Sequence, residues 1–209
     1  MVTRHGLFLA FMALLAAERV LELVLSRRNA ARAFAQGGRE TGQGHYRVMV
    51  LFHTLFLAAC VAEVLLWQRP FPGALGWAAL GGALAAQALR YWAIWALGER
   101  WNSRIIVVPG AAPVTRGPYR FLRHPNYVAV VLELLCVPLI HGAWVTAAAF
   151  TLGNLLLLWV RIRAEEAALG ASWAQAFRGL PRFVPEVRAE LRSGETRADD
   201  VRSDEVHRG

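Results

Sequence analysis

Residues 127–160 read YVAVVLELLCVPLIHGAWVTAAAFTLGNLLLLWV, two apolar runs separated by His141-Gly142. The second run, Ala143–Val160, carries no charge and is of the length and composition that a membrane-crossing helix requires. The first run, Tyr127–Ile140, has only 14 residues. As a helix it would measure roughly 21 Å, whereas the hydrocarbon core of a bilayer is about 30 Å thick. The stretch therefore predicts a helical hairpin in a membrane, with a short or broken first arm.

Three further apolar runs precede this hairpin, at Gly6–Leu25, Val48–Trp67 and Phe71–Leu97. We therefore expect an all-α protein, a polytopic membrane bundle of about five transmembrane helices that ends in the helical hairpin. This membrane domain would occupy residues 1–185. Residues 186–209 mix Arg with Asp and Glu and have few large apolar side chains, so we expect a disordered tail.

The first apolar run has a second interpretation as a cleaved signal peptide. Arg4 precedes an apolar stretch that ends in an Ala-Ala pair, as at a cleavage site. However, the chain continues through Glu18-Arg19 into further apolar residues up to Leu25, a pattern that signal peptides lack. A membrane helix is the better explanation.

Composition and charge support a membrane protein. Hydrophobic residues make up 56% of the chain and charged residues 18%, against about 45–50% and 25% in soluble domains. The formal net charge is +8, and every basic side chain apart from His is Arg. A basic chain could bind nucleic acid, but Arg residues placed between apolar runs fit cationic loops held against an anionic leaflet. Cys60 and Cys136 lie inside apolar runs and match neither a metal site nor a redox pair, so we interpret both as packing residues.

The distribution of Arg predicts the orientation in the membrane. The loops Ser26–Arg47 and Gly98–Asn126 are rich in Arg, whereas the turns Gln68–Pro70 and His141-Gly142 have one Arg and none. Rich and poor connections alternate, as the positive-inside rule requires. We expect a protein of a bacterial inner membrane with its N-terminus outside and both long loops and the C-terminus in the cytoplasm.

Charged side chains within the predicted spans are costly and usually mark a site or a buried pair. They are Glu18, Arg19, Glu22, Glu63, Arg90 and Glu133. One interpretation is that Arg90 neutralises a carboxylate inside the bundle. Another is that Glu133, six residues after Tyr127, borders a substrate cavity. Arg90 and Glu133 are therefore candidate substrate-binding residues.

The loop that leads into the hairpin is dense in Gly and Pro. Residues 109–133 read PGAAPVTRGPYRFLRHPNYVAVVLE. Pro125 suits the first turn of a helix, where its missing N–H is not needed. His124 and Tyr127 would then lie at the mouth of the bundle. Read alone, such a loop could equally be a simple connection.

A second polar stretch, RIRAEE at residues 161–166, follows the last apolar run. Arg161 and Glu165 are four residues apart and share one face of a helix. Without further context they would be an ordinary ion pair at a solvated helix end, and the nearby Arg163 could anchor the helix at the membrane surface.

Taken together, these two stretches resemble a known family. GPYRFLRHPNY at residues 117–127, followed about 35 residues later by RIRAEE, is similar to the isoprenylcysteine carboxyl methyltransferase family and its phospholipid methyltransferase relatives. The resemblance covers roughly residues 90–185. Arg90-Tyr-Trp, the segment at 101–110 and Glu133 resemble bacterial members linked to type III polyketide synthases, which O-methylate alkylpyrones and related phenolics.

One segment departs from the family pattern. The prenylcysteine branch often has a His and a Leu where this chain reads Ala111-Ala112-Pro113-Val114. This departure puts the substrate in doubt rather than the reaction.

The resemblance implies an S-adenosylmethionine-dependent O-methyltransferase with a lipid-like acceptor, either a long-chain alkylpyrone or phenolic polyketide or a prenylcysteine carboxylate. The implied cofactor-binding residues are Pro113, Val114, Tyr119, His124, Pro125, Asn126, Tyr127 and Glu165. The implied catalytic residue is Arg161, whose planar guanidinium could hold an oxyanion in line with the methyl group. A carboxylate suits the ribose hydroxyls or the amino group of the cofactor, and aromatic faces suit its sulfonium. No metal is implied.

Two other functions remain open from the sequence. An NADPH-dependent membrane reductase of sterol-reductase type has a similar C-terminal hairpin, but would predict a larger chain. A non-catalytic scaffold or lipid-binding protein would be expected to have lost at least one residue of the motifs, yet all are present. The expected partners are a lipid-like small molecule and membrane lipids, without nucleic acid; the oligomeric state is not predicted.

Overall fold

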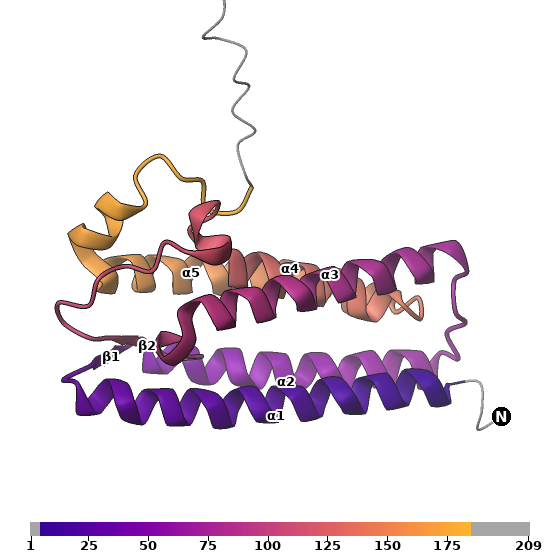
Figure 1. The fold of residues 1–209 in the computed structure, drawn as a ribbon. Helices are drawn as coiled ribbons and strands as arrows, with labels where there is room; N and C mark the ends of the chain where they lie inside the picture. Colours follow the sequence, from indigo (N-terminus) through magenta and orange to yellow (C-terminus); the bar gives the residue numbers. More distant parts are fainter. Residues whose placement is uncertain (1–4, 185–209) are drawn as a thin grey trace, which may run out of the picture.

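The computed structural model describes residues 5–184, in which five helices are joined by one long connection, 98–124, and by three shorter ones (Figure 1). The helices are α1 (Gly6–Ala35), α2 (Gln43–Leu66), α3 (Ala74–Leu97), α4 (Pro125–Leu139) and α5 (Trp144–Ala176). The predicted set of five helices, with a short fourth helix and a turn at His141-Gly142, is confirmed. The predicted disordered tail lies outside the described residues.

The helices form two layers. Figure 1 shows α1 and α2 side by side in one layer, with α3 and the α4–α5 hairpin in the other. The connections 36–42 and 98–124 gather at the end of the bundle far from the N-terminus, which we call the loop end. Phe56, Val64 and Leu134 are almost completely buried in the main core between the layers.

Small residues bring α3 and α4 close together. A methyl group at Gly82 would meet the Cys136 sulfur at 2.7 Å, so only glycine allows this approach. Ala79, Ala83 and Ala86 are buried on the same helix. Cys136 is free and packs at this contact, and Cys60 is free and fully buried. Their interpretation as packing residues agrees with these positions.

The all-α prediction missed a small antiparallel ribbon at the loop end. Strand β1 (Arg39–Thr41) pairs with β2 (Ile105–Val107), with Glu40 opposite Ile106. Arg104 also forms an ion pair with Glu40. Strands of three residues are too short to show a repeating pattern in the sequence, because an alternation of buried and exposed side chains needs four or more residues. The ribbon ties the connection 36–42 to the connection 98–124.

Two helices continue beyond the predicted spans. α1 runs ten residues past Leu25, and α5 continues to Ala176. Ala and Arg dominate the α1 extension, and Ala, Arg and Glu are frequent in the α5 extension; all three are strong helix formers, so each helix persists after its apolar run ends. In α5 the backbone leaves the helical conformation at Gly170 (φ 73°, ψ −164°), a region that is nearly restricted to glycine. The turn that follows, with Trp173, therefore points in a new direction.

By length and composition, α2 and α5 are apolar enough to cross a membrane, and α4 is a shorter apolar helix. α1 and α3 carry most of the charged and polar side chains within the bundle, but their outer faces are apolar. Leu14 and Leu21 of α1 and Trp95 of α3 are all largely exposed. The number of five transmembrane helices stays a prediction.

Candidate functional site

A cavity of about 1440 Å³ lies between the two layers and extends to the loop end. Its walls come from all five helices and from the connections 36–42 and 98–124. Sites for a single small molecule usually measure about 300–1,000 Å³. This cavity therefore has room for more than one ligand of that size.

The structure brings most of the predicted site residues to this cavity. The cavity-lining members of the predicted set are Pro113, Val114, Tyr119, His124, Asn126, Tyr127, Arg161, Glu165 and, deeper in the bundle, Arg90. Two predicted residues do not line it. Pro125 is buried in the first turn of α4, where it starts the helix. Glu133 does not line the cavity itself but forms ion pairs with Arg90 and Arg19, which do.

Arg161 is the centre of the polar network at the loop end. Its Nε donates to the Tyr127 hydroxyl at 2.8 Å, and this hydroxyl donates in turn to the Glu165 carboxylate. Its Nη2 donates to the Ser103 carbonyl at 2.6 Å. Nη1 is buried and has no hydrogen-bond partner within residues 5–184. Since Arg161 is only 5% exposed, this leaves a buried cationic donor without an acceptor at the cavity wall.

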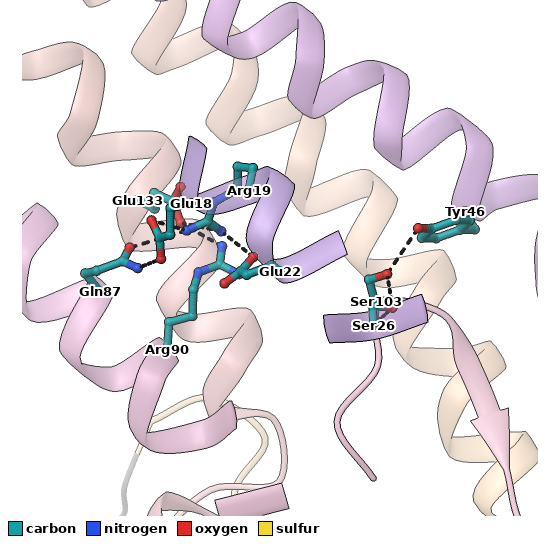
Figure 2. Close-up of polar contacts among 9 residues, drawn as sticks. All are labelled: Glu18, Arg19, Glu22, Ser26, Tyr46, Gln87, Arg90, Ser103 and Glu133. Carbon is teal, nitrogen blue, oxygen red and sulfur yellow. Dashed lines mark hydrogen bonds and ion pairs between the residues drawn. The ribbon is translucent and has the colours of Figure 1, made fainter. Parts of the chain in front are cut away.

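A second set of hydrogen bonds fixes the loop that carries Ser103. The Ser103 amide donates to the Ser26 hydroxyl at 3.1 Å, and the two hydroxyls are 2.8 Å apart. The Tyr46 hydroxyl is 3.1 Å from the Ser103 hydroxyl (Figure 2). Ser103 thus connects α1 and α2 to Arg161 on α5. None of these three residues was predicted to belong to the site. Ser26 and Tyr46 lie outside the recognised motifs, and Ser103 lies in the segment 101–110, to which the resemblance assigned no role.

The turn at His124 is held by contacts to α5 and to residues 181–182. His124 Nε2 lies 3.0 Å from Glu166 Oε1, and Arg182 donates to both oxygens of Glu166 at 3.0 and 2.6 Å. The backbone amides of Arg123 and His124 donate to the carbonyls of Pro181 and Arg182. Burial opposes ionisation of Glu166, but hydrogen bonds from Arg182 and His124 outweigh it and hold its pKa below the usual value. Glu166 is therefore ionised at neutral pH.

Aromatic rings gather around His124. Its ring stacks on Tyr127 with centroids 5.3 Å apart, and Trp173 lies 5.5 Å away on α5 beyond the Gly170 break. Phe177 packs on Trp173 at 4.8 Å. Tyr119 is buried in the same cluster, and burial raises the pKa of its phenol above the ordinary value, so it stays neutral at neutral pH. Trp173 and Phe177, which also line the cavity, were not predicted because they lie outside the recognised motifs.

A cluster of charged side chains occupies the middle of the bundle (Figure 2). Its members are Glu18, Arg19, Glu22, Gln87, Arg90 and Glu133. Arg90 is 2.7 Å from Glu133 and 3.6 Å from Glu22. Arg19 is 2.9 Å from Glu18 and 3.0 Å from Glu22. Arg90 thus pairs with carboxylates inside the bundle and also lines the cavity, whereas Glu133 does not line it. A role of either residue in substrate binding stays a prediction.

The chain is similar to a solved structure and to two proteins of known sequence. The fold matches a solved structure described as the eukaryotic intramembrane Ras methyltransferase ICMT (isoprenylcysteine carboxyl methyltransferase), with a TM-score of 0.51 and 19% identity. The match covers 70% of this chain and 55% of that one, so this chain spans about half of its length. The two proteins therefore share a helical fold.

Sequence relatives point to the same family. The model of the isoprenylcysteine carboxyl methyltransferase (ICMT) family matches residues 77–171. The uncharacterized protein YpbQ of Bacillus subtilis is 43% identical over 164 residues, which cover 78% of this chain and 96% of YpbQ. An uncharacterized protein of Haemophilus influenzae is 28% identical over 154 residues, 72% of this chain and 88% of that protein. The chain belongs to the isoprenylcysteine carboxyl methyltransferase family, whose members are integral membrane methyltransferases.

Proposed function

We propose that this protein is an S-adenosylmethionine-dependent O-methyltransferase that acts on a lipid-like acceptor. The observation that carries the proposal is the buried guanidinium of Arg161, which lines the cavity with one nitrogen unpaired among the described residues. A buried cationic donor without an acceptor is costly unless a ligand supplies one. An anionic acceptor oxygen fits this position, because the other two nitrogens already hold the guanidinium in place.

The residues around Arg161 suit S-adenosylmethionine. Its sulfonium supplies the methyl group, and a positive centre of this kind is attracted to aromatic faces such as those of Tyr119, Tyr127 and Trp173. The Glu165 carboxylate can accept hydrogen bonds from hydroxyl or amino groups. Asn126 adds a buried side-chain oxygen at the cavity wall with no partner in the described part of the chain. These features support the predicted cofactor site.

The acceptor would be either a long-chain alkylpyrone or phenolic polyketide, or a prenylcysteine carboxylate. Both classes offer an oxygen that is already ionised or readily ionised near neutral pH, so the reaction needs positioning by Arg161 more than a strong base. The apolar parts of the cavity wall, such as Leu57, Val130 and Leu158, suit an apolar tail. The departure at Ala111–Val114 from the prenylcysteine branch favours the first class.

The same proposal includes the membrane topology. All five helices would be embedded, with the N-terminus outside and the loop end in the cytoplasm of a bacterial cell, at the inner membrane. Trp77 and Trp95 are exposed at the two ends of α3, and 18 residues of helix separate them by about 27 Å. Tryptophan is enriched at both membrane interfaces, and this spacing is close to the thickness of the hydrocarbon core.

The decisive experiment is calorimetric titration of the detergent-purified protein with S-adenosylhomocysteine. We expect binding in the micromolar range, weakened at least tenfold in Glu165→Ala. Arg163→Ala is the matched control, because Arg163 lies on the same helix but its guanidinium packs over Trp159 and does not line the cavity. A folded wild-type protein that does not bind S-adenosylhomocysteine would contradict the proposal, and NADPH would then be titrated to test a reductase.

A further inference from the structure

The cavity-facing side of α5 carries a polar residue that the proposed reaction does not use. Asn154, Leu158, Arg161 and Glu165 all line the cavity at spacings of four, three and four residues, so they lie on one face of the helix. Asn154 is the innermost of the four. It is seven residues from Arg161, or about 10 Å along the helix axis.

Asn154 has no internal role that would explain it. Its side chain is 0% exposed, and neither its amide nitrogen nor its amide oxygen has a hydrogen-bond partner in the described structure. It lies in the apolar run of α5, where an unpaired buried amide is unfavourable. Both atoms lie just beneath the cavity surface. The terminal torsion of Asn rotates over a broad range, so a small rotation turns the amide toward a ligand.

A histidine on the facing helix α2 lines the same cavity. His53 Nδ1 lies 2.8 Å from the carbonyl oxygen of Met49. A carbonyl only accepts, so Nδ1 carries the proton, and Nε2 of the neutral ring is left with a free lone pair. No described residue forms a hydrogen bond with Nε2.

The two side chains lie at the same depth. On α2, His53 is seven residues from Tyr46, and on α5, Asn154 is seven residues from Arg161. Tyr46 and Arg161 are joined at the loop end, because both contact Ser103. Seven residues of helix measure about 10 Å, so His53 and Asn154 each lie about 10 Å from the level of Ser103, toward the middle of the bundle. The neighbouring residues are also in contact across the layers, since a methyl group at Gly153 would meet the Phe52 ring at 3.0 Å.

We infer that His53 and Asn154 form a specificity subsite for an uncharged hydroxyl group on the tail of the acceptor, about 10 Å from the oxygen that is methylated. A hydroxyl donates to His53 Nε2 and accepts from the Asn154 amide, so it satisfies both groups at once. This inference rests on the proposed methyltransferase function and narrows its substrate. The acceptor then carries two polar groups: the oxygen that is methylated and a hydroxyl on its tail, which binds at the middle of the bundle.

The test compares two 4-hydroxy-2-pyrone acceptors with alkyl tails of equal length, one of which carries a hydroxyl about 10 Å from the ring hydroxyl. Initial rates are measured with the full-length protein in lipid nanodiscs. We expect the hydroxylated acceptor to have a KM about five- to tenfold lower, the contribution of one neutral hydrogen bond. Asn154→Leu and His53→Phe should each bring the ratio of the two KM values close to one.

Thr151→Val is the matched control, because the Thr151 hydroxyl is also buried without a partner in the described residues of α5 but does not line the cavity. It should keep the wild-type ratio. A merely structural role for Asn154 would leave the KM ratio unchanged in Asn154→Leu, and this result overturns the inference, as do equal KM values in the wild type. Binding of S-adenosylhomocysteine, measured in parallel, shows whether the proposed function itself has failed. If Asn154→Leu does not fold, the ratio of the two KM values in His53→Phe tests the inference instead.

Discussion

Arg161 uses two of its three guanidinium nitrogens to hold its own position, through Tyr127 and the Ser103 carbonyl. Lysine can place one positive charge near the same point, but it cannot form these two contacts and present a third donor in a fixed plane. We therefore predict that Arg161→Lys lowers kcat by about 10²–10³-fold, as loss of a single preorganised donor to a developing charge does elsewhere. Affinity for S-adenosylhomocysteine should change far less.

Steady-state rates with a long-chain hydroxypyrone, together with calorimetry, check this prediction. Arg163→Lys is the control and should keep its activity, because Arg163 is outside the cavity wall. A large loss of cofactor affinity with little change in kcat would instead assign Arg161 to the cofactor.

A second prediction for single residues concerns the buried ion pair between Arg90 and Glu133. Both side chains are nearly fully buried, with Nη2 of Arg90 2.7 Å from Oε2 of Glu133. We expect Arg90→Met to lower the free energy of unfolding by about 3–5 kcal/mol, because it leaves a buried carboxylate without its partner. Arg90→Met combined with Glu133→Met should recover most of this loss. Unfolding in detergent measures both, and strictly additive effects would show that the pair is not coupled.

Some residues of the candidate site could be predicted from the sequence, and others could not. The motif residues that line the cavity were predicted only through the resemblance of their motifs to a known family, whereas the charges in the spans were unusual by themselves. Their pairing was not predictable, because Arg90 is 43 residues from Glu133 and could have met any of several carboxylates. Asn154 was not predicted, because a neutral amide in an apolar run carries no charge that would distinguish it.

At the scale of elements, the apolar runs predicted which helices exist but not where they end. The lipid-facing pattern stops at the membrane surface, whereas helix propensity does not, so α1 and α5 continue into the loop end. The Gly170 break and the β1–β2 ribbon both depend on tertiary contacts of only a few residues. Neither produces a periodicity in the sequence.

The contact between α5 and the segment 180–182 gives a prediction on pH. Because the pKa of folded Glu166 is lowered, its contribution to stability is present above the unfolded value, about 4.3, and is lost as pH falls through the folded value. We expect the segment to stay attached from pH 8 to 5 and to loosen only below about pH 4.5. The effect of this partly exposed pair should be about 1 kcal/mol or less.

Hydrogen exchange of the Arg123 and His124 amides reports this attachment, because both donate to the segment. After correction for the intrinsic rate, Glu166→Gln should exchange faster at every pH and without a step. Glu99→Gln, in an exposed pair with Arg32, should behave as the wild type. Loosening that already begins between pH 7 and 6 would contradict control by Glu166.

For the whole molecule, the two-layer arrangement was not predictable from the sequence, because several packings of five apolar helices bury similar surfaces. The orientation was predictable in principle from the alternation of Arg between connections. With this predicted orientation, Ala74, at the start of α3, would face the outside, and Gln175, beyond the Gly170 break, would face the cytoplasm. Both positions are exposed.

Labelling with a membrane-impermeant maleimide tests this orientation. We expect Ala74→Cys to react in intact cells and Gln175→Cys only after permeabilisation. The wild type provides the background, since Cys60 is fully buried and Cys136 packs against Gly82. The reverse pattern would invert the topology, and labelling of both in intact cells would contradict the number of spans between them.

The short length of α4 affects how a lipid-like acceptor would reach the site from the bilayer. Its 15 residues measure about 22 Å, so in the proposed topology its first turn, with Asn126 and Tyr127, would begin several ångströms below the level at which the longer helices leave the hydrocarbon. Non-helical backbone at this depth is tolerated because it lines a cavity. The reacting oxygen can therefore be reached without pulling the tail into water. Such extraction costs about 0.8 kcal/mol for each methylene, roughly 8 kcal/mol for a ten-carbon chain. The partition free energy of the acceptor thus does not add to the barrier, and longer tails raise its local concentration at the protein without slowing its turnover.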